Sequence, residues 1–145
     1  METVLVVDDE ADICELARDC LVAAGYRVLE ARDGEEALRI AEGHTEPIHL
    51  LLTDVVMPRL NGVELAGRLN RQRPDTKVLY MSGFAVVGAQ IEQLSGPSLQ
   101  LGDSILPKPF STETLTRKVR EILDRPAPSR SPFSRARTRP DQWWP

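Results

Sequence analysis

Four short apolar runs in this chain end in polar residues, and segments with helical periodicity separate the runs. The runs are residues 4–7, 50–52, 78–81 and 105–107. The polar residues that follow them are Asp8, Asp9, Asp54, Ser82 and Lys108. Runs this apolar are typical of parallel strands that helices cover on both faces. Because the carboxyl ends of parallel strands share one edge of the sheet, where ligands bind, we expect these five side chains to form one site.

The segments between the runs carry apolar residues at helical spacing and recognisable end signals. Gly25 ends the first of them, and Asp33, Asn61 and Ser111 are placed as N-caps of later ones. We expect helices at residues 13–24, 34–41, 62–69, 84–100 and 112–123, and strands at residues 4–7, 26–31, 48–53, 77–81 and 104–106. This alternation predicts an α/β fold with a doubly wound parallel sheet.

The chain divides into an acidic body and a basic tail. Residues 1–124 hold 13 Lys and Arg against 21 Asp and Glu, a net charge of −8. Residues 125–145 hold five arginines against one aspartate, a net charge of +4, and five prolines. We therefore expect a single domain at residues 1–124 and a flexible tail or linker at residues 125–145. The acidic body argues against nucleic acid as the partner of this domain.

Composition excludes several other classes of protein. No apolar stretch approaches the roughly 18 residues that a membrane span requires, and Met1-Glu2-Thr3 lacks the basic start of a signal peptide. We therefore expect a cytoplasmic protein without a membrane partner. Cys14 and Cys20 point to different faces of one expected helix, so they cannot form a disulfide with each other. No zinc-binding pattern is present in the sequence.

The five strand-end side chains predict chemistry as well as position. Three carboxylates at close range repel one another unless a cation neutralises them. Mg²⁺ prefers oxygen ligands and commonly takes one or two carboxylates together with phosphate oxygens. A hydroxyl from Ser82 and an ammonium from Lys108 would complete a pocket that is suited to phosphoryl chemistry.

The same residues carry a resemblance to a known family. The blocks at residues 6–10, 53–58 with 61–62, 81–83 and 108–110 resemble the receiver (CheY-like) domain of two-component response regulators, in order and at the usual spacing. The resemblance covers about residues 3–124. It implies a flavodoxin-like, five-stranded sheet in the order 2-1-3-4-5, flanked by five helices. It also implies an aspartate that takes a phosphoryl group from a histidine kinase in a two-component phosphorelay.

Position by position, the resemblance implies a role for each residue of the site. Asp54 is the phosphoacceptor, and Mg²⁺ is bound by Asp8, Asp9, Asp54 and the backbone carbonyl of Val56. Ser82 is the hydroxyl that hydrogen-bonds the acquired phosphoryl group.

Lys108 pairs with the same phosphoryl group, and the Lys108-Pro109 bond resembles the cis peptide of the family. The chain departs from the family at Ile105, where an aromatic residue is common. Val56 and Phe84, which would flank the phosphorylated aspartate, are both apolar and cannot orient an attacking water, so we expect a long-lived phosphorylated form.

Three other functions fit the sequence less well. A receiver-like interaction module that is not regulated by phosphorylation would not need the complete acidic set with Lys108. An aspartyl phosphatase would need a second carboxylate at the position of Val56, so we expect no turnover enzyme. A Rossmann enzyme would need a glycine-rich turn where residues 8–10 stand.

The resemblance also implies the kind of partner. The expected partner is a histidine kinase or a histidine phosphotransfer protein. The end of the domain resembles receivers that are attached to hybrid sensor kinases, so domains of the same kinase are a further candidate.

Overall fold

The computed structural model of this chain describes residues 1–83 and 105–125. The helix expected at residues 84–100, the side chain of Phe84 and the tail beyond residue 125 lie outside the described residues. The division into a domain that ends at residue 124 and a flexible tail therefore stays a prediction.

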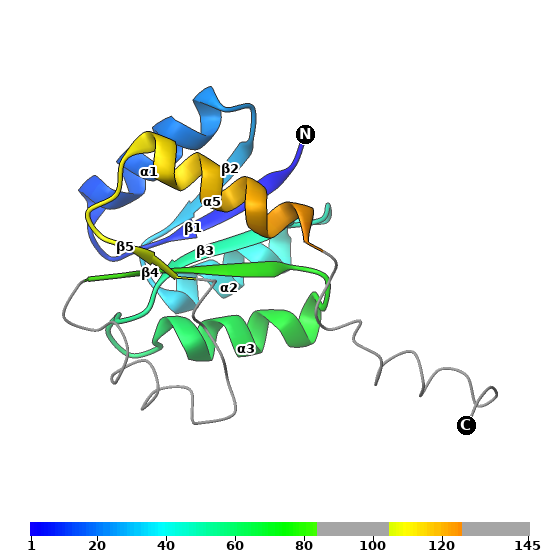
Figure 1. Ribbon diagram of the computed structural model, residues 1–145. Helices are drawn as coiled ribbons and strands as arrows, with labels where there is room; N and C mark the ends of the chain where they lie inside the picture. The colour runs from blue at the N-terminus through cyan, green and yellow to red at the C-terminus, as the bar shows by residue number, and fades with distance from the viewer. Residues whose placement is uncertain (84–104, 126–145) are drawn as a thin grey trace, which may run out of the picture.

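Five strands form one parallel sheet in the order β2-β1-β3-β4-β5 (Figure 1). They are β1 (Thr3–Val7), β2 (Arg27–Ala31), β3 (Leu50–Asp54), β4 (Lys77–Ser82) and β5 (Ile105–Pro107). The register pairs Val7 with Thr53 and Asp54 with Met81, so β1, β3 and β4 end side by side. The predicted fold class and strand order are confirmed. Asp54 and Ser82 differ slightly from expectation, because each is the last residue of its strand and not the first residue after it.

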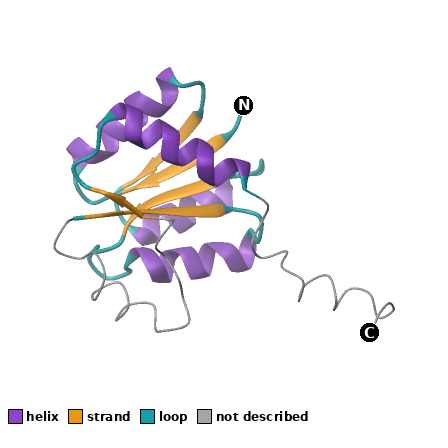
Figure 2. Cartoon of the chain, in the orientation of Figure 1, coloured by secondary structure: helices purple, strands orange, loops and turns teal. Residues whose placement is uncertain are grey.

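Helices cover both faces of the sheet, as the uniformly apolar strands predict (Figures 1 and 2). Those in the described part of the chain are α1 (Ala11–Ala23), α2 (Gly34–Gly43), α3 (Gly62–Gln72) and α5 (Thr112–Asp124). The side chains of β1 alternate between the two layers: Val4 and Val6 pack with α1 and α5, whereas Leu5 and Val7 pack with α2 and α3. None of these helices is long and apolar enough to cross a membrane.

Local side chains fix where three helices begin. The carboxylate of Asp33 accepts a hydrogen bond from the N–H of Glu36 at the start of α2, and the hydroxyl of Ser111 accepts one from Thr114 at the start of α5. Asn61 and Glu64 form a reciprocal capping box at the start of α3. These N-caps confirm the sequence prediction. Each cap also fixes the end of the loop that precedes its helix. Residues of the candidate functional site lie in loops of this kind.

Both cysteines are buried and free, as expected. The thiol of Cys14 donates to the backbone carbonyl of Asp8 at 3.3 Å, and burial raises its pKa to about 11. Cys20 contacts the hydroxyl of Thr112 at 3.1 Å and so links α1 to α5. The two thiols are therefore structural, and the first of them supports the turn that carries the acidic residues.

Candidate functional site

Three carboxylates meet at the carboxyl edge of the sheet. Asp8 and Asp9 follow β1, Asp54 ends β3, and one oxygen atom of each lies within 4.8 Å of the others. Asp8 is completely buried and Asp54 is 7% exposed, whereas Asp9 faces solvent. The carboxylates lie close together because β1 and β3 are neighbours in the sheet, although Asp8 and Asp54 are 46 positions apart in the sequence.

Lys108 reaches into this cluster from the turn after β5. Its Nζ atom lies 2.8 Å from Oδ2 of Asp8, 3.3 Å from Oε1 of Glu10 and 3.4 Å from Oδ2 of Asp54. The backbone N–H of Lys108 donates to the carbonyl of Ser82 at 2.8 Å, which ties the turn to the end of β4. The Lys108-Pro109 peptide bond is cis, as the resemblance implies. One ammonium therefore contacts three carboxylates.

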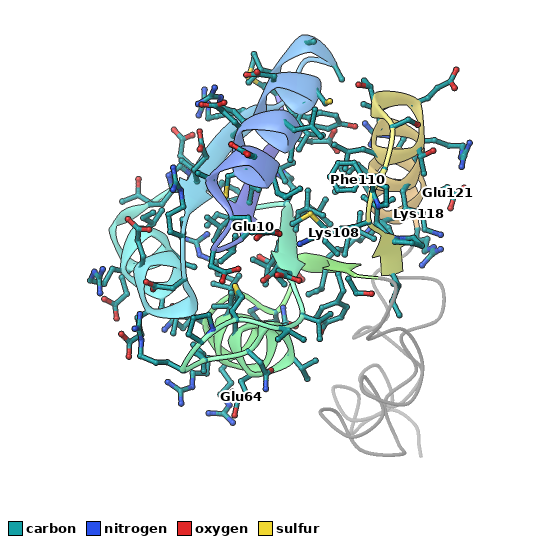
Figure 3. All side chains as sticks on the ribbon, turned by 90° about the vertical axis from the view of Figure 1, so that its left-hand side faces the viewer. Glu10, Glu64, Lys108, Phe110, Lys118 and Glu121 are labelled. Atoms are coloured by element: carbon teal, nitrogen blue, oxygen red, sulfur yellow. The ribbon has the colours of Figure 1, made fainter. Side chains whose placement is uncertain are left out.

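Glu10 belongs to the site although the sequence pattern assigned it no role. Its carboxylate hydrogen-bonds the ammonium of Lys108, and Figure 3 shows the two side chains close together at this edge. The backbone N–H of Glu10 in turn donates to Oδ1 of Asp8 at 2.9 Å. The sequence signal that could have indicated this role is that Glu10 is the third consecutive acidic residue after the first strand. The contact itself joins residues that lie 98 positions apart, so no local pattern could predict it.

Burial and repulsion make Asp8 and Asp54 difficult to ionise together. Burial raises the pKa of Asp54 to about 6, and the charge of Asp8 adds to this effect. Burial also raises the pKa of Asp8, against the contact with Lys108, which lowers it. For Lys108, burial lowers the pKa, but the contacts with Asp8 and Asp54 outweigh burial and the pKa is raised. The ammonium stays charged, and a surplus of negative charge remains at the site.

Ser82 and Val56 complete the surroundings of Asp54. Ser82 is fully buried at the end of β4, next to β3, and within the described part of the chain its hydroxyl makes one long contact, of 3.4 Å, with the carbonyl of Gly83. Val56 is two residues beyond Asp54 and its side chain is 52% exposed. The residue two positions beyond Asp54 therefore presents an exposed apolar side chain.

The start of α3 rests directly on the backbone of Asp54. The N–H of Gly62 donates to the carbonyl of Val55 at 2.8 Å. A Cβ atom at position 62 would overlap the carbonyl oxygen of Asp54 and lie 3.0 Å from its carbonyl carbon. Glycine is required here because the helix and the strand end approach each other at backbone distance.

The site fits a hard divalent cation. Its possible ligands are carboxylate oxygens, which Mg²⁺ prefers. The buried Oδ2 atom of Asp8 accepts no hydrogen bond of standard geometry from the described residues, despite the nearby ammonium. A cation would give this atom a second positively charged partner besides Lys108 and would also reduce the repulsion that raises the pKa of Asp54.

The fold and this acidic edge define a phosphoacceptor domain of the CheY-like class. The response regulator receiver domain family matches residues 4–120. The chain belongs to this family, and it is a phosphoacceptor receiver domain of two-component signal transduction.

Similar proteins include complete regulators and single domains. The chain is 36% identical to the transcriptional regulatory protein CpxR of Escherichia coli (strain K12) over 86% of this chain and 50% of that protein. It thus spans about half the length of such relatives. It is 33% identical to the response regulator receiver protein CpdR of Brucella abortus (strain 2308), over 85% of this chain and 98% of that protein.

Solved structures agree with this assignment. The chemotaxis response regulator CheY4 of Vibrio cholerae is 31% identical, with a TM-score of 0.67 over 84% of this chain and 98% of that chain. The receiver domain of the hybrid histidine kinase CckA is 34% identical, with a TM-score of 0.67 over 84% of this chain and 99% of that chain.

Proposed function

We propose that Asp54 accepts the phosphoryl group. A carboxylate oxygen of Asp54 attacks the phosphorus atom of a phosphohistidine, a P–O bond forms, the P–N bond breaks, and the imidazole leaves with a proton. The observation that supports this role is the position of Asp54, nearly buried, within 4.8 Å of two other carboxylates and 3.4 Å from an ammonium. Such transfers depend mainly on positioning and on nearby positive charge.

The other residues of the site have complementary roles in this proposal. Asp8, Asp9, Asp54 and the backbone carbonyl of Val56 would hold Mg²⁺, which when bound supplies positive charge to the transferred group. The ammonium of Lys108, already 3.4 Å from Asp54, pairs with the phosphoryl oxygens once they are attached. The hydroxyl of Ser82, at the end of the adjacent strand, hydrogen-bonds one of them.

A phosphorylation assay tests this proposal. The chain is incubated with a small-molecule phosphodonor and Mg²⁺ and its intact mass is measured. We expect the mass of one phosphoryl group to be added, and no addition in Asp54→Asn or in the presence of a chelator. Equal labelling of wild type and Asp54→Asn would refute the assignment of Asp54.

The roles of the carboxylates and of Lys108 can be separated by Mg²⁺ titration. Asp9→Ala removes a ligand and a charge, and we expect Mg²⁺ affinity to fall by about tenfold or more. Lys108→Ala removes a cation that competes for the carboxylates, so affinity should be unchanged or higher while phosphorylation slows. Loss of Mg²⁺ affinity in Lys108→Ala as large as in Asp9→Ala would contradict these roles.

The exposed apolar side chain of Val56 predicts a long-lived phosphorylated form. Loss of phosphate requires a water molecule that is held in line with the phosphorus atom, and the side chain of Val56 offers it no hydrogen bond. We expect Val56→Asn to lose its phosphoryl group several-fold faster than wild type at fixed Mg²⁺. Val56→Leu is the matched apolar control and should resemble wild type. An equal rate for Val56→Asn would disprove this account of the lifetime.

The proposal extends to partners and location. The donor is a histidine kinase or a histidine phosphotransfer protein, and the likeness to the CckA receiver makes domains of the same hybrid kinase one candidate source. The chain acts in the cytoplasm and accepts one phosphoryl group per molecule without turning over a substrate. The receiver-like module that is never phosphorylated is disfavoured, because the acidic cluster and Lys108 come together in one place.

A further inference from the structure

The loop that follows Asp54 is held by a helix from another part of the chain. This loop, residues 55–61, contains Val56 and leads into α3. Its Leu60 is buried and packs against Gly34, the first residue of α2. A Cβ atom at position 34 would lie 2.6 Å from Cδ2 and 3.0 Å from Cβ of Leu60. Leu60 can therefore pack against the start of α2 because residue 34 has no side chain.

The backbone conformation does not account for this glycine. Among the described glycines only Gly25 has a positive φ. Gly34 begins an α-helix, where alanine would ordinarily be the more favourable residue. Packing against Leu60 is thus the reason for glycine at this position.

Arg59 makes a second connection between the loop and the same helix end. Its Nη2 atom lies 3.1 Å from Oδ2 of Asp33, and its Nε atom lies 3.7 Å from Oε1 of Glu35. The other oxygen of Asp33 accepts the N–H of Glu36, so one carboxylate both caps α2 and holds the loop. Arg59 has a φ of 69°, which is uncommon for a residue other than glycine. The loop therefore has a defined conformation that contacts with α2 support.

We infer that Asp33, Gly34, Arg59 and Leu60 form a latch that positions the loop for metal binding. These residues do not touch the metal site; they act through the loop that carries the Val56 carbonyl. Mg²⁺ demands near-ideal octahedral geometry, so a small displacement of one ligand weakens binding. This inference rests on the proposed function, in which that carbonyl is a ligand. The start of α2 then positions a loop that carries a metal ligand, although no residue of α2 binds the metal itself.

Mg²⁺ titration of latch variants, followed by amide NMR shifts, tests the inference. In Gly34→Ala the new methyl group displaces Leu60, and we expect Mg²⁺ affinity to fall by about tenfold, the scale for outer-shell changes. Leu60→Ala in the same chain removes the clashing Cδ2 atom but also loses the packing of Leu60, so we expect it to restore only part of the affinity. A defect of α2 that does not act through Leu60 would not be relieved by this second change. Gly67→Ala is the matched control, because a Cβ atom there meets nothing within 4 Å. Its affinity should equal that of wild type.

A second variant covers the case in which Gly34→Ala does not fold. Arg59→Asn removes the ion pairs but tolerates the positive φ, and we expect Mg²⁺ affinity to fall by about threefold, within the range for an exposed ion pair. Wild-type affinity in Gly34→Ala, or in Arg59→Asn if the first variant is unfolded, would overturn the latch alone. A wild-type chain that binds no Mg²⁺ would overturn the proposed function and the latch together.

Discussion

Replacing Gly62 with alanine is expected to destabilise the protein by about 3 kcal/mol or more, at the upper end for overpacking. The added Cβ atom would overlap the carbonyl oxygen of Asp54 and approach Cα of Val55 to 3.1 Å. These are backbone atoms next to a strand that is paired on both sides, so they cannot rotate away as a side chain would. Urea denaturation followed by circular dichroism would measure the change in the free energy of unfolding.

Gly67 provides the control for this experiment. It lies in the middle of α3, is exposed, and has open space where a Cβ atom would be. We expect Gly67→Ala to stabilise the protein by about 0.5–1 kcal/mol through helix propensity. If Gly62→Ala were as mild as Gly67→Ala, α3 would be free to move away from Asp54, and the close approach described above would not constrain the site.

Asp54→Asn is expected to stabilise the metal-free protein by about 1–3 kcal/mol at pH 7.5. The variant keeps the shape of the side chain but removes a buried charge that lies beside Asp8. In the wild type, burial and the charge of Asp8 raise the pKa of Asp54 to about 6, from an ordinary value of 3.8. Ionising Asp54 in the folded protein therefore costs free energy that the unfolded chain does not require.

The sign of the pH dependence follows from this raised pKa. Below about pH 4 the carboxyl of Asp54 is protonated in the folded protein and in the unfolded chain, so its contribution to stability is at its full value there. As pH rises from about 4 to 6, the unfolded chain releases the proton more readily than the folded protein, so stability falls. We expect this fall in wild type with a chelator present, and a smaller fall in Asp54→Asn.

The matched control is Glu15→Gln, which removes an exposed carboxylate on α1. It should change stability by no more than about 0.5 kcal/mol. Saturating Mg²⁺ should stabilise wild type, because a ligand that binds only the folded state adds to its stability. Asp54→Asn that is less stable than wild type without metal would contradict the description of this cluster as mutually repelling.

Features that depend on local sequence were predictable. The N-caps Asp33, Asn61 and Ser111 act within three residues of themselves, so the sequence alone located them. The gathering of Asp8 and Asp54 was predictable for a different reason. Parallel topology places every strand end at one edge, whatever the length of chain between them.

Features that depend on tertiary packing were not predictable. The contact between Leu60 and Gly34 depends on how the loop after β3 lies over α2, and a glycine at a helix start does not by itself indicate a packing partner. The positive φ of Arg59 could not be expected, because arginine rarely adopts it. The ends of a strand also depend on its pairing with neighbouring strands. The sequence predicted a strand from Ile48, but β3 begins at Leu50, where its ladder with Val4 begins.

The most direct test of the central proposal is to identify the phosphorylated residue chemically. An aspartyl phosphate is an acyl phosphate, and borohydride reduces it to homoserine at the residue that carried the phosphoryl group. After phosphorylation with Mg²⁺ and reduction, peptide mass spectrometry should find homoserine at position 54 and aspartate at positions 8 and 9. Homoserine at Asp8 or Asp9, or a phosphorylated chain that yields none at position 54, would contradict the assignment of Asp54 as the phosphoacceptor.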